Sequence, residues 1–153
     1  MLVRLLYASR STSEIDDALL AAIMERSGRF NTEFGITGIL CSYPQGKVFL
    51  QALEGGREAV NSLYGNLLRD PRHPLATLLE YSEITERLFS GWRMGNVNLN
   101  RVNVGSILRF SEKPVLDPFT MNGQTALLLL RELANTAAIT SNPPIWLEFT
   151  PSS

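Results

Sequence analysis

Apolar and polar residues alternate along several stretches of the chain, a pattern typical of half-buried β-strands. The predicted strands cover residues 2–9, 36–43, 47–54, 78–85 and 92–98. Two amphipathic stretches with helical spacing lie between them and predict helices at residues 13–27 and 60–68. The order β-α-β-β-α-β-β predicts an α+β, ferredoxin-like fold, in which a mixed sheet carries both helices on one face.

Local signals set the limits of the first predicted helix. Ser11 and Glu14 have the spacing of a capping box, which marks a helix start, and Gly28 is a typical residue just beyond a helix end. Residues 30–35 are therefore expected to form a loop that leads into the second strand. Asn31 would lie in this loop and close an Asx-turn.

The last third of the chain has a different pattern. It predicts a short helix at 102–110, a linker at 114–119, a longer helix at 124–138 and an apolar tail at 145–149. The longer helix is apolar almost all round at residues 127–130, which a solitary surface helix does not tolerate. It must therefore pack on the uncovered face of the sheet, on another copy of the chain or on a partner. We expect one domain over residues 1–98 and a C-terminal helical extension, a cap or output segment, over residues 99–153.

Composition narrows the range of functions. The 153 residues are 44 % apolar and 19 % charged, which suits a folded domain, and 14 basic residues nearly balance 15 acidic ones. This balance gives no reason to expect nucleic acid or anionic lipid as a partner. The single cysteine, Cys41, and the single histidine, His73, exclude an internal disulfide and metal sites built from several such residues. Without a signal peptide or an apolar run of bilayer length, a cytoplasmic location and no membrane partner are expected.

Polar side chains occupy positions that should be apolar. Tyr7 and Ser9 share a strand face with apolar residues, and Gln51 does so on the third strand. The predicted topology makes these two strands neighbours, so Tyr7 and Gln51 could form a hydrogen bond. They are either a satisfied buried pair or a pair whose amide has spare capacity for a ligand.

Other residues also allow a structural and a functional interpretation. On spacing alone, Asn31 suits a loop turn. Exposed positions suit Asn66, Arg72 and His73, and core packing suits Trp92 and Met94.

A series of short motifs resembles the BLUF family, the blue-light sensors that use flavin. The motifs occur in order over residues 1–98, about two thirds of the chain. They are Leu6-Tyr7-Ala8-Ser9, Asn31 with Gly35-Ile36-Thr37-Gly38-Ile39-Leu40, Phe49-Leu50-Gln51-Ala52-Leu53-Glu54-Gly55, Val60 to Tyr64, Asp70-Pro71-Arg72-His73 and Phe89-Ser90-Gly91-Trp92-Arg93-Met94.

The resemblance implies an oxidised flavin between the two helices, with FAD expected in the cell and FMN as the alternative. Tyr7 would donate an electron and a proton to the photoexcited ring, and Gln51 would bridge the ring and the tyrosine. Asn31 resembles the family asparagine that binds the ring edge. Ser9 matches the Tyr-x-Ser pattern of the first strand.

The resemblance extends to the signalling and tail-binding residues. Trp92 and Met94 match the pair on the fifth strand that carries the signal outward. Arg72 and His73 match the family segment that could meet a ribityl or phosphate group. Asn66 departs from the family, because many relatives carry arginine or histidine near the flavin at this position.

The predicted function is therefore a flavin photoreceptor without substrate turnover. Its output would pass to a downstream signalling protein or through a change in self-association, and a homo-oligomer is expected. Two alternatives belong to other classes. One is a small ferredoxin-like enzyme in which Asn66, Arg72 and His73 bind an anionic substrate. The other is a cofactor-free interaction module that uses the helix at residues 124–138.

Overall fold

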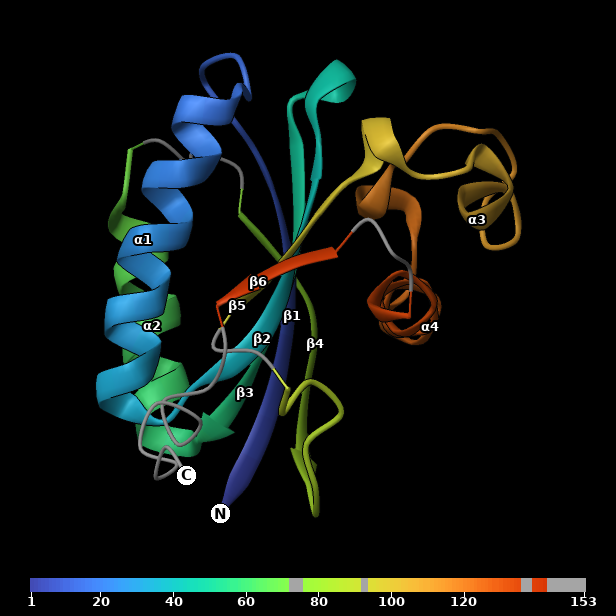
Figure 1. The fold of residues 1–153 in the computed structure, drawn as a ribbon. Helices are drawn as coiled ribbons and strands as arrows, with labels where there is room; N and C mark the ends of the chain where they lie inside the picture. Colours follow the sequence, from blue (N-terminus) through green and yellow to red (C-terminus); the bar gives the residue numbers. More distant parts are fainter. Residues whose placement is uncertain (72–75, 92–93, 136–138, 143–153) are drawn as a thin grey trace, which may run out of the picture.

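A computed structural model describes residues 1–71, 76–91, 94–135 and 139–142 of the chain. The elements are β1 (Leu2–Arg10), α1 (Asp17–Phe34), β2 (Thr37–Tyr43), η1 (Pro44–Gly46), β3 (Val48–Gly56), α2 (Arg57–Arg69), β4 (Thr77–Ile84), β5 (Met94–Asn98), η2 (Leu99–Arg101), α3 (Val104–Leu108), η3 (Pro118–Thr120), α4 (Gly123–Ala134) and β6 (Ile139–Asn142). The sheet has the order β4-β1-β3-β2-β5-β6, and only β2 and β5 run parallel. Helices α1 and α2 cover one face and α4 lies on the other (Figure 1). The predicted α+β class with a mixed sheet is confirmed.

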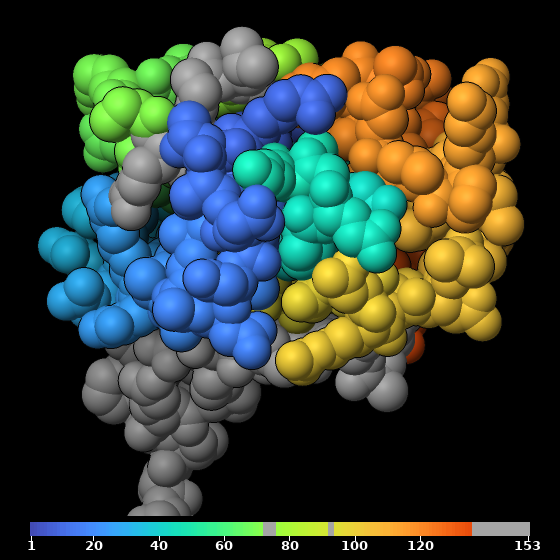
Figure 2. All heavy atoms as spheres, turned by 90° about the horizontal axis from the view of Figure 1, so that it is seen from above, coloured from blue at the N-terminus to red at the C-terminus, as the bar shows by residue number. Residues whose placement is uncertain are grey.

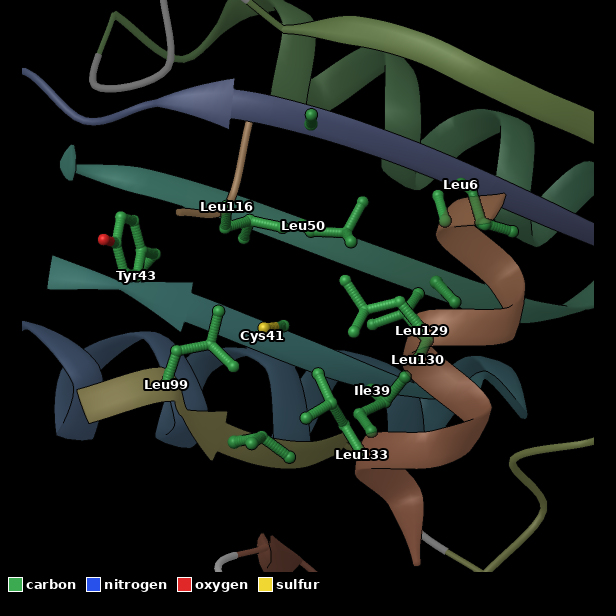
Figure 3. Packing of buried hydrophobic residues seen from close by; sticks show 14 of the residues in the cluster. Leu6, Ile39, Cys41, Tyr43, Leu50, Leu99, Leu116, Leu129, Leu130 and Leu133 are labelled. Carbon is green, nitrogen blue, oxygen red and sulfur yellow. The ribbon is translucent and has the colours of Figure 1, made fainter. Parts of the chain in front are cut away.

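The sheet separates two apolar cores. Successive residues of a strand point to opposite faces, so β3 places Leu53 in the core beneath α1 and α2 and Leu50 in the core beneath α4. Figure 3 shows Leu129 and Leu130 of α4 directed toward the sheet in this second core. Cys41 is fully buried there, and burial raises the pKa of its thiol. Seen from above in Figure 2, the teal hairpin around η1 lies between blue α1 and the orange C-terminal segment.

Helix α1 begins later than the sequence predicted. The capping-box interpretation of Ser11 and Glu14 is wrong, because the N-cap is Asp16, whose carboxylate accepts a hydrogen bond from Leu19 N at 2.8 Å. Ile15, just before this cap, is 6 % exposed and belongs to the core beneath the helices. An apolar residue directly before the N-cap favours this start, because it buries the incoming chain against the helix.

Helix α1 also ends later than predicted, and residues 30–34 are helical rather than a loop. Gly28 lies inside the helix and is buried, so it does not end it. The end comes at Gly35, whose φ of 68° is the left-handed conformation that glycine adopts without strain. Asn31 therefore lies in the last turn of α1, where its carbonyl accepts a hydrogen bond from Ile36 N at 3.0 Å. The Asx-turn interpretation is wrong.

The C-terminal segment folds back onto its own sheet. Four residues of α4 are fully buried in the core on the face away from α1 and α2, so the first of the three predicted alternatives is the one observed. The four are Ala126, Leu129, Leu130 and Leu133. Gly123 at the helix start lies so close to β4 that an added Cβ would be 2.8 Å from the Leu79 carbonyl oxygen. Among the helices described, none has both the length and the apolar character needed to cross a bilayer.

The long helix predicted at 124–138 ends earlier than predicted, because α4 ends at Ala134 and Asn135 is its C-cap. Residues 139–142 form strand β6, which pairs antiparallel with β5 at the edge of the sheet. The predicted helix at 102–110 is shorter, because only Val104–Leu108 is α-helical. The apolar tail predicted at 145–149 lies outside the described residues.

Substitution of Leu130 by Ala should destabilise the fold by about 2–5 kcal/mol, because it removes a fully buried side chain and leaves a cavity. Leu128 on the same helix is 49 % exposed, so Leu128→Ala is a matched control that we expect to change stability little. Urea unfolding of both variants measures the difference. Equal midpoints for Leu130→Ala and Leu128→Ala would contradict the packing of α4 on the sheet.

Candidate functional site

The predicted pair of Tyr7 and Gln51 is present at the centre of the sheet. The two residues are direct partners in the antiparallel register of β1 and β3, and both side chains face α1 and α2. Tyr7 Oη donates a hydrogen bond to Gln51 Oε1. Tyr7 is 3 % exposed and Gln51 is 5 % exposed. Burial raises the pKa of the Tyr7 phenol, with smaller contributions from Tyr64 and Asp70, so the phenol stays protonated.

The other end of the Gln51 carboxamide reaches β5. Gln51 Nε2 donates a hydrogen bond to Met94 Sδ at 3.3 Å, and Met94 is fully buried. A thioether is a weak acceptor, so this bond is easily exchanged for a better one. Among the residues that the structure describes, Met94 is the acceptor available to this amide nitrogen. The arrangement is a hydrogen-bonded chain from β1 through β3 to β5, with unused donor capacity at its middle.

A second aromatic ring covers the pair from α2. The ring centroids of Tyr64 and Tyr7 are 5.6 Å apart, and their planes are tilted by 55°. The sequence indicated Tyr64 as part of the second amphipathic stretch and of the motif Val60 to Tyr64, without a role of its own. Partial burial raises the pKa of its phenol.

A cleft runs between α1 and α2 above the sheet. Its volume is about 150 Å³, and Asn66 lies in its wall on the α2 side. Asn66 Oδ1 accepts a hydrogen bond from Arg69 Nη2 at 2.6 Å. Tyr7 and Gln51 do not line the cleft, but its lining residues Ile23 and Leu63 pack against the core that contains Tyr7.

The α1 side of this cleft was not predicted. Arg26, Ser27 and Phe30 line it, and Asp70 closes it at the end of α2. The signal was present in the sequence, because residues 23, 26, 27 and 30 share one face of a helix. Ending the predicted helix at residue 27 left Phe30 outside that face.

The structure places the remaining predicted site residues as follows. Ser9 is fully buried, two positions after Tyr7 and on the same strand face. Asn31 is 1 % exposed in the last turn of α1. Arg72, His73 and Trp92 lie outside the described residues. The structure thus brings Tyr7, Gln51 and Met94 into direct contact.

The site suits a planar aromatic ligand with a hydrogen-bonding edge. A cleft with apolar and polar lining residues lies between two helices above a buried amide that has donor capacity left, and one wall carries a second amide, Asn66. These are the features expected of a flavin site, because the isoalloxazine ring is flat and has carbonyl and nitrogen acceptors along one edge. The fold and site therefore define an α+β protein with a ligand cleft between two helices and no evident nucleophile or acid–base pair among the described site residues.

Comparison with known proteins identifies the family. Residues 2–95 match the family model of BLUF, sensors of blue-light using FAD, and the chain belongs to this family. The photoactivated adenylate cyclase subunit beta of Euglena gracilis is 35 % identical over 94 residues, 61 % of this chain and 11 % of that protein. The chain thus spans about a tenth of the length of this curated relative.

Solved structures agree over more of the chain. The photo-activated state of BlsA is 33 % identical with a TM-score of 0.78, covering 90 % of this chain and 98 % of that one. The dark-state structure of BlrB, a BLUF protein, is 30 % identical with a TM-score of 0.68, covering 87 % of this chain and 94 % of that one. The chain is a member of a family of flavin-binding blue-light sensors, and the alternatives of an anion-binding enzyme and a cofactor-free module are not favoured.

Proposed function

We propose that Tyr7 and Gln51 are the photoactive residues of this blue-light sensor and that Met94 receives the change in their hydrogen bonds. The observation that carries the proposal is the buried chain of contacts from Tyr7 Oη through the Gln51 carboxamide to Met94 Sδ. Trp92, two residues before Met94, is the second residue proposed to carry the signal.

The flavin is proposed to bind between α1 and α2. Asn31 would bind the ring edge, and Ser9 and Asn66 would contribute further polar contacts. Arg72 and His73 would meet the ribityl or phosphate part. We propose FAD as the form bound in the cell, in keeping with the description of the family.

When bound, the flavin supplies absorption of blue light and, once excited, an acceptor for an electron and a proton. Tyr7 is the proposed donor. Its phenol is held protonated by burial, so loss of an electron must be accompanied by loss of the proton from Oη, and Gln51 Oε1 is the acceptor in contact with it.

The Gln51 carboxamide is the proposed switch. Rotation of a carboxamide exchanges its acceptor oxygen for its donor nitrogen, so rotation would break the bond from Nε2 to Met94 Sδ and reverse the polarity toward Tyr7. Once the electron and the proton have returned to Tyr7, no covalent bond in the protein has changed, so the two arrangements are two states of one hydrogen-bond network. This chemistry consumes no substrate.

The output is proposed to run from β5 into the C-terminal segment. Val97 of β5 belongs to the same core as Leu133 of α4, so a shift of β5 is transmitted to α4 by direct packing. In this proposal residues 1–98 sense light and residues 99–153 respond. The receiver is a separate signalling protein, with a change in self-association as the second route.

Absorption spectroscopy tests the proposed function. The purified chain reconstituted with FAD is expected to show an oxidised flavin spectrum that shifts to the red under blue light and returns in the dark. Release of flavin from protein purified without added cofactor, followed by mass spectrometry, distinguishes FAD from FMN. A chain that binds no flavin, or binds it without a reversible shift, would contradict the proposal.

A further inference from the structure

Strand β3 contacts both ends of the connection from β4 to β5. Gln51 bonds the start of β5 at Met94, and Glu54 bonds the connection shortly after β4. Because the two residues are three positions apart on one strand, their side chains point to opposite faces of the sheet. Gln51 therefore acts from the cleft side, whereas Glu54 acts from the side of α4.

The Glu54 carboxylate is fully buried, and both of its oxygens accept hydrogen bonds. Oε2 accepts hydrogen bonds from Arg4 Nε at 2.9 Å and from Leu88 N at 3.0 Å, and Oε1 accepts one from Phe89 N at 2.6 Å. Bonds to an ionised carboxylate are roughly twice as strong as those between neutral groups. The Phe89 ring is also buried in the core on this face. The backbone at residues 88 and 89 is therefore fixed to β3.

Arg87 extends this attachment to β2. Its Nη2 donates to Gly35 O at 2.8 Å, and its Nη1 donates to Thr37 Oγ1 at 2.9 Å and to Glu54 O at 3.4 Å. The connection is thus bound to the sheet through three consecutive residues, 87 to 89.

The two ends of the connection differ in strength. Residues 87 to 89 are held to β3 by a buried carboxylate and a guanidinium, whereas the side-chain contact of β3 with Met94 is one hydrogen bond to sulfur; β5 itself is held in the sheet by pairing with β2 and β6. A change at Gln51 would therefore alter the contact of β3 with β5 and leave the bonds from Glu54 to residues 87 to 89 in place.

We infer that Glu54 is a positioning residue that fixes the start of the β4–β5 connection, so that a rearrangement of Gln51 moves β5 and leaves β4 unmoved. The inference rests on the proposed function, because it assumes that light rearranges Gln51. Glu54 touches no part of the proposed flavin site. Its role is to direct the displacement toward the C-terminal segment.

Hydrogen exchange of the flavin-loaded full chain, measured in the dark and under blue light, tests this inference. In the wild type, light should change exchange in peptides from β5 and leave peptides from β4 unchanged. In Glu54→Gln, the amides of Leu88 and Phe89 should exchange on the order of tenfold faster in the dark, because the neutral amide of glutamine is a weaker hydrogen-bond acceptor than a carboxylate. The light-induced change should then spread into β4.

A second pair of variants covers the case in which Glu54→Gln leaves Arg4 without its charge partner and prevents folding. Leu88→Pro removes one amide donor to Glu54, whereas Leu88→Ala keeps it, and the Leu88 side chain is 40 % exposed. Light-induced change should spread into β4 in Leu88→Pro and stay in β5 in Leu88→Ala.

The inference is overturned if light changes β4 in the wild type as much as β5, or if the change stays within β5 in the folded variants that lack these bonds. The flavin spectrum of the same samples separates the two proposals. A normal red shift together with a wild-type exchange pattern in the variants rejects the role of Glu54 but not the proposed function. A wild type without a red shift rejects the proposed function and this inference together.

Discussion

Replacement of Tyr7 by Phe is expected to abolish the red shift under blue light while the protein still binds flavin. The substitution removes the phenolic proton and the easily oxidised ring but keeps the shape that fills the core. It also leaves Gln51 Oε1 without its donor, which should lower stability by about 1–3 kcal/mol. Light-minus-dark absorption at equal flavin occupancy measures the effect.

Tyr64→Phe is the matched control for this experiment. Its ring lies 5.6 Å from that of Tyr7, but the hydroxyl of Tyr64 is not part of the chain from Tyr7 to Met94. We expect Tyr64→Phe to retain a reversible red shift. An unchanged shift and dark recovery in Tyr7→Phe, or loss of the shift in both variants, would show that Tyr7 is not the specific donor.

Replacement of Gln51 by Leu should remove the red-shifted state completely. Leucine has a similar size and fills the site, but it can neither accept from Tyr7 Oη nor donate to Met94 Sδ. The hydrogen-bonded path from Tyr7 on β1 to Met94 on β5 is then lost. The buried Tyr7 hydroxyl also loses its acceptor, at a cost of about 1–3 kcal/mol. The flavin should still bind, since the walls of the cleft are intact.

The same absorption difference, with flavin fluorescence to confirm binding, measures this second effect. Gln45→Leu serves as the control, because Gln45 is exposed in η1 and its side chain bonds Tyr43 rather than the site. A red shift of wild-type size in Gln51→Leu would rule out the carboxamide as the switch. Loss of the shift in Gln45→Leu as well would indicate a general effect of removing an amide.

The pairing of Tyr7 with Gln51 was predictable because it depends on two regular features. Strand alternation puts both side chains on a defined face, and the β-α-β-β-α-β order makes β1 and β3 neighbours. The contact between Gln51 and Met94 was harder to predict from the sequence. It crosses β2, which lies between β3 and β5, and depends on side-chain reach rather than on register.

The limits of α1 show why local signals mislead. The chain offers two plausible caps at its start and two glycines near its end, and each pair is similar in local terms. Burial of Ile15 and Gly28 decides in favour of Asp16 and Gly35, and burial is a property of the assembled fold. The misplaced end also left Phe30 out of the helix face that forms one wall of the cleft.

Strand β6 and the bonds of Glu54 were beyond sequence reasoning for a different reason. Residues 139–142 have no strand-like alternation strong enough to stand out, and they become a strand by pairing with β5, more than 40 positions earlier. In the sequence, Glu54 appeared only as one residue of the motif from Phe49 to Gly55. Its partners, Arg4 and the amides of Leu88 and Phe89, come from distant parts of the chain.

The central strand β3 has the proposed switch on one side and the packing surface of α4 on the other, one residue apart. Gln51 faces the helical cleft, while its neighbours Leu50 and Ala52 lie in the core beneath α4. Since dense interiors transmit small displacements, changes in how α4 is seated should alter the surroundings of the chromophore. The colour of the protein would then report on events at its opposite surface, so that binding of a partner to α4 could be followed optically, without any added label.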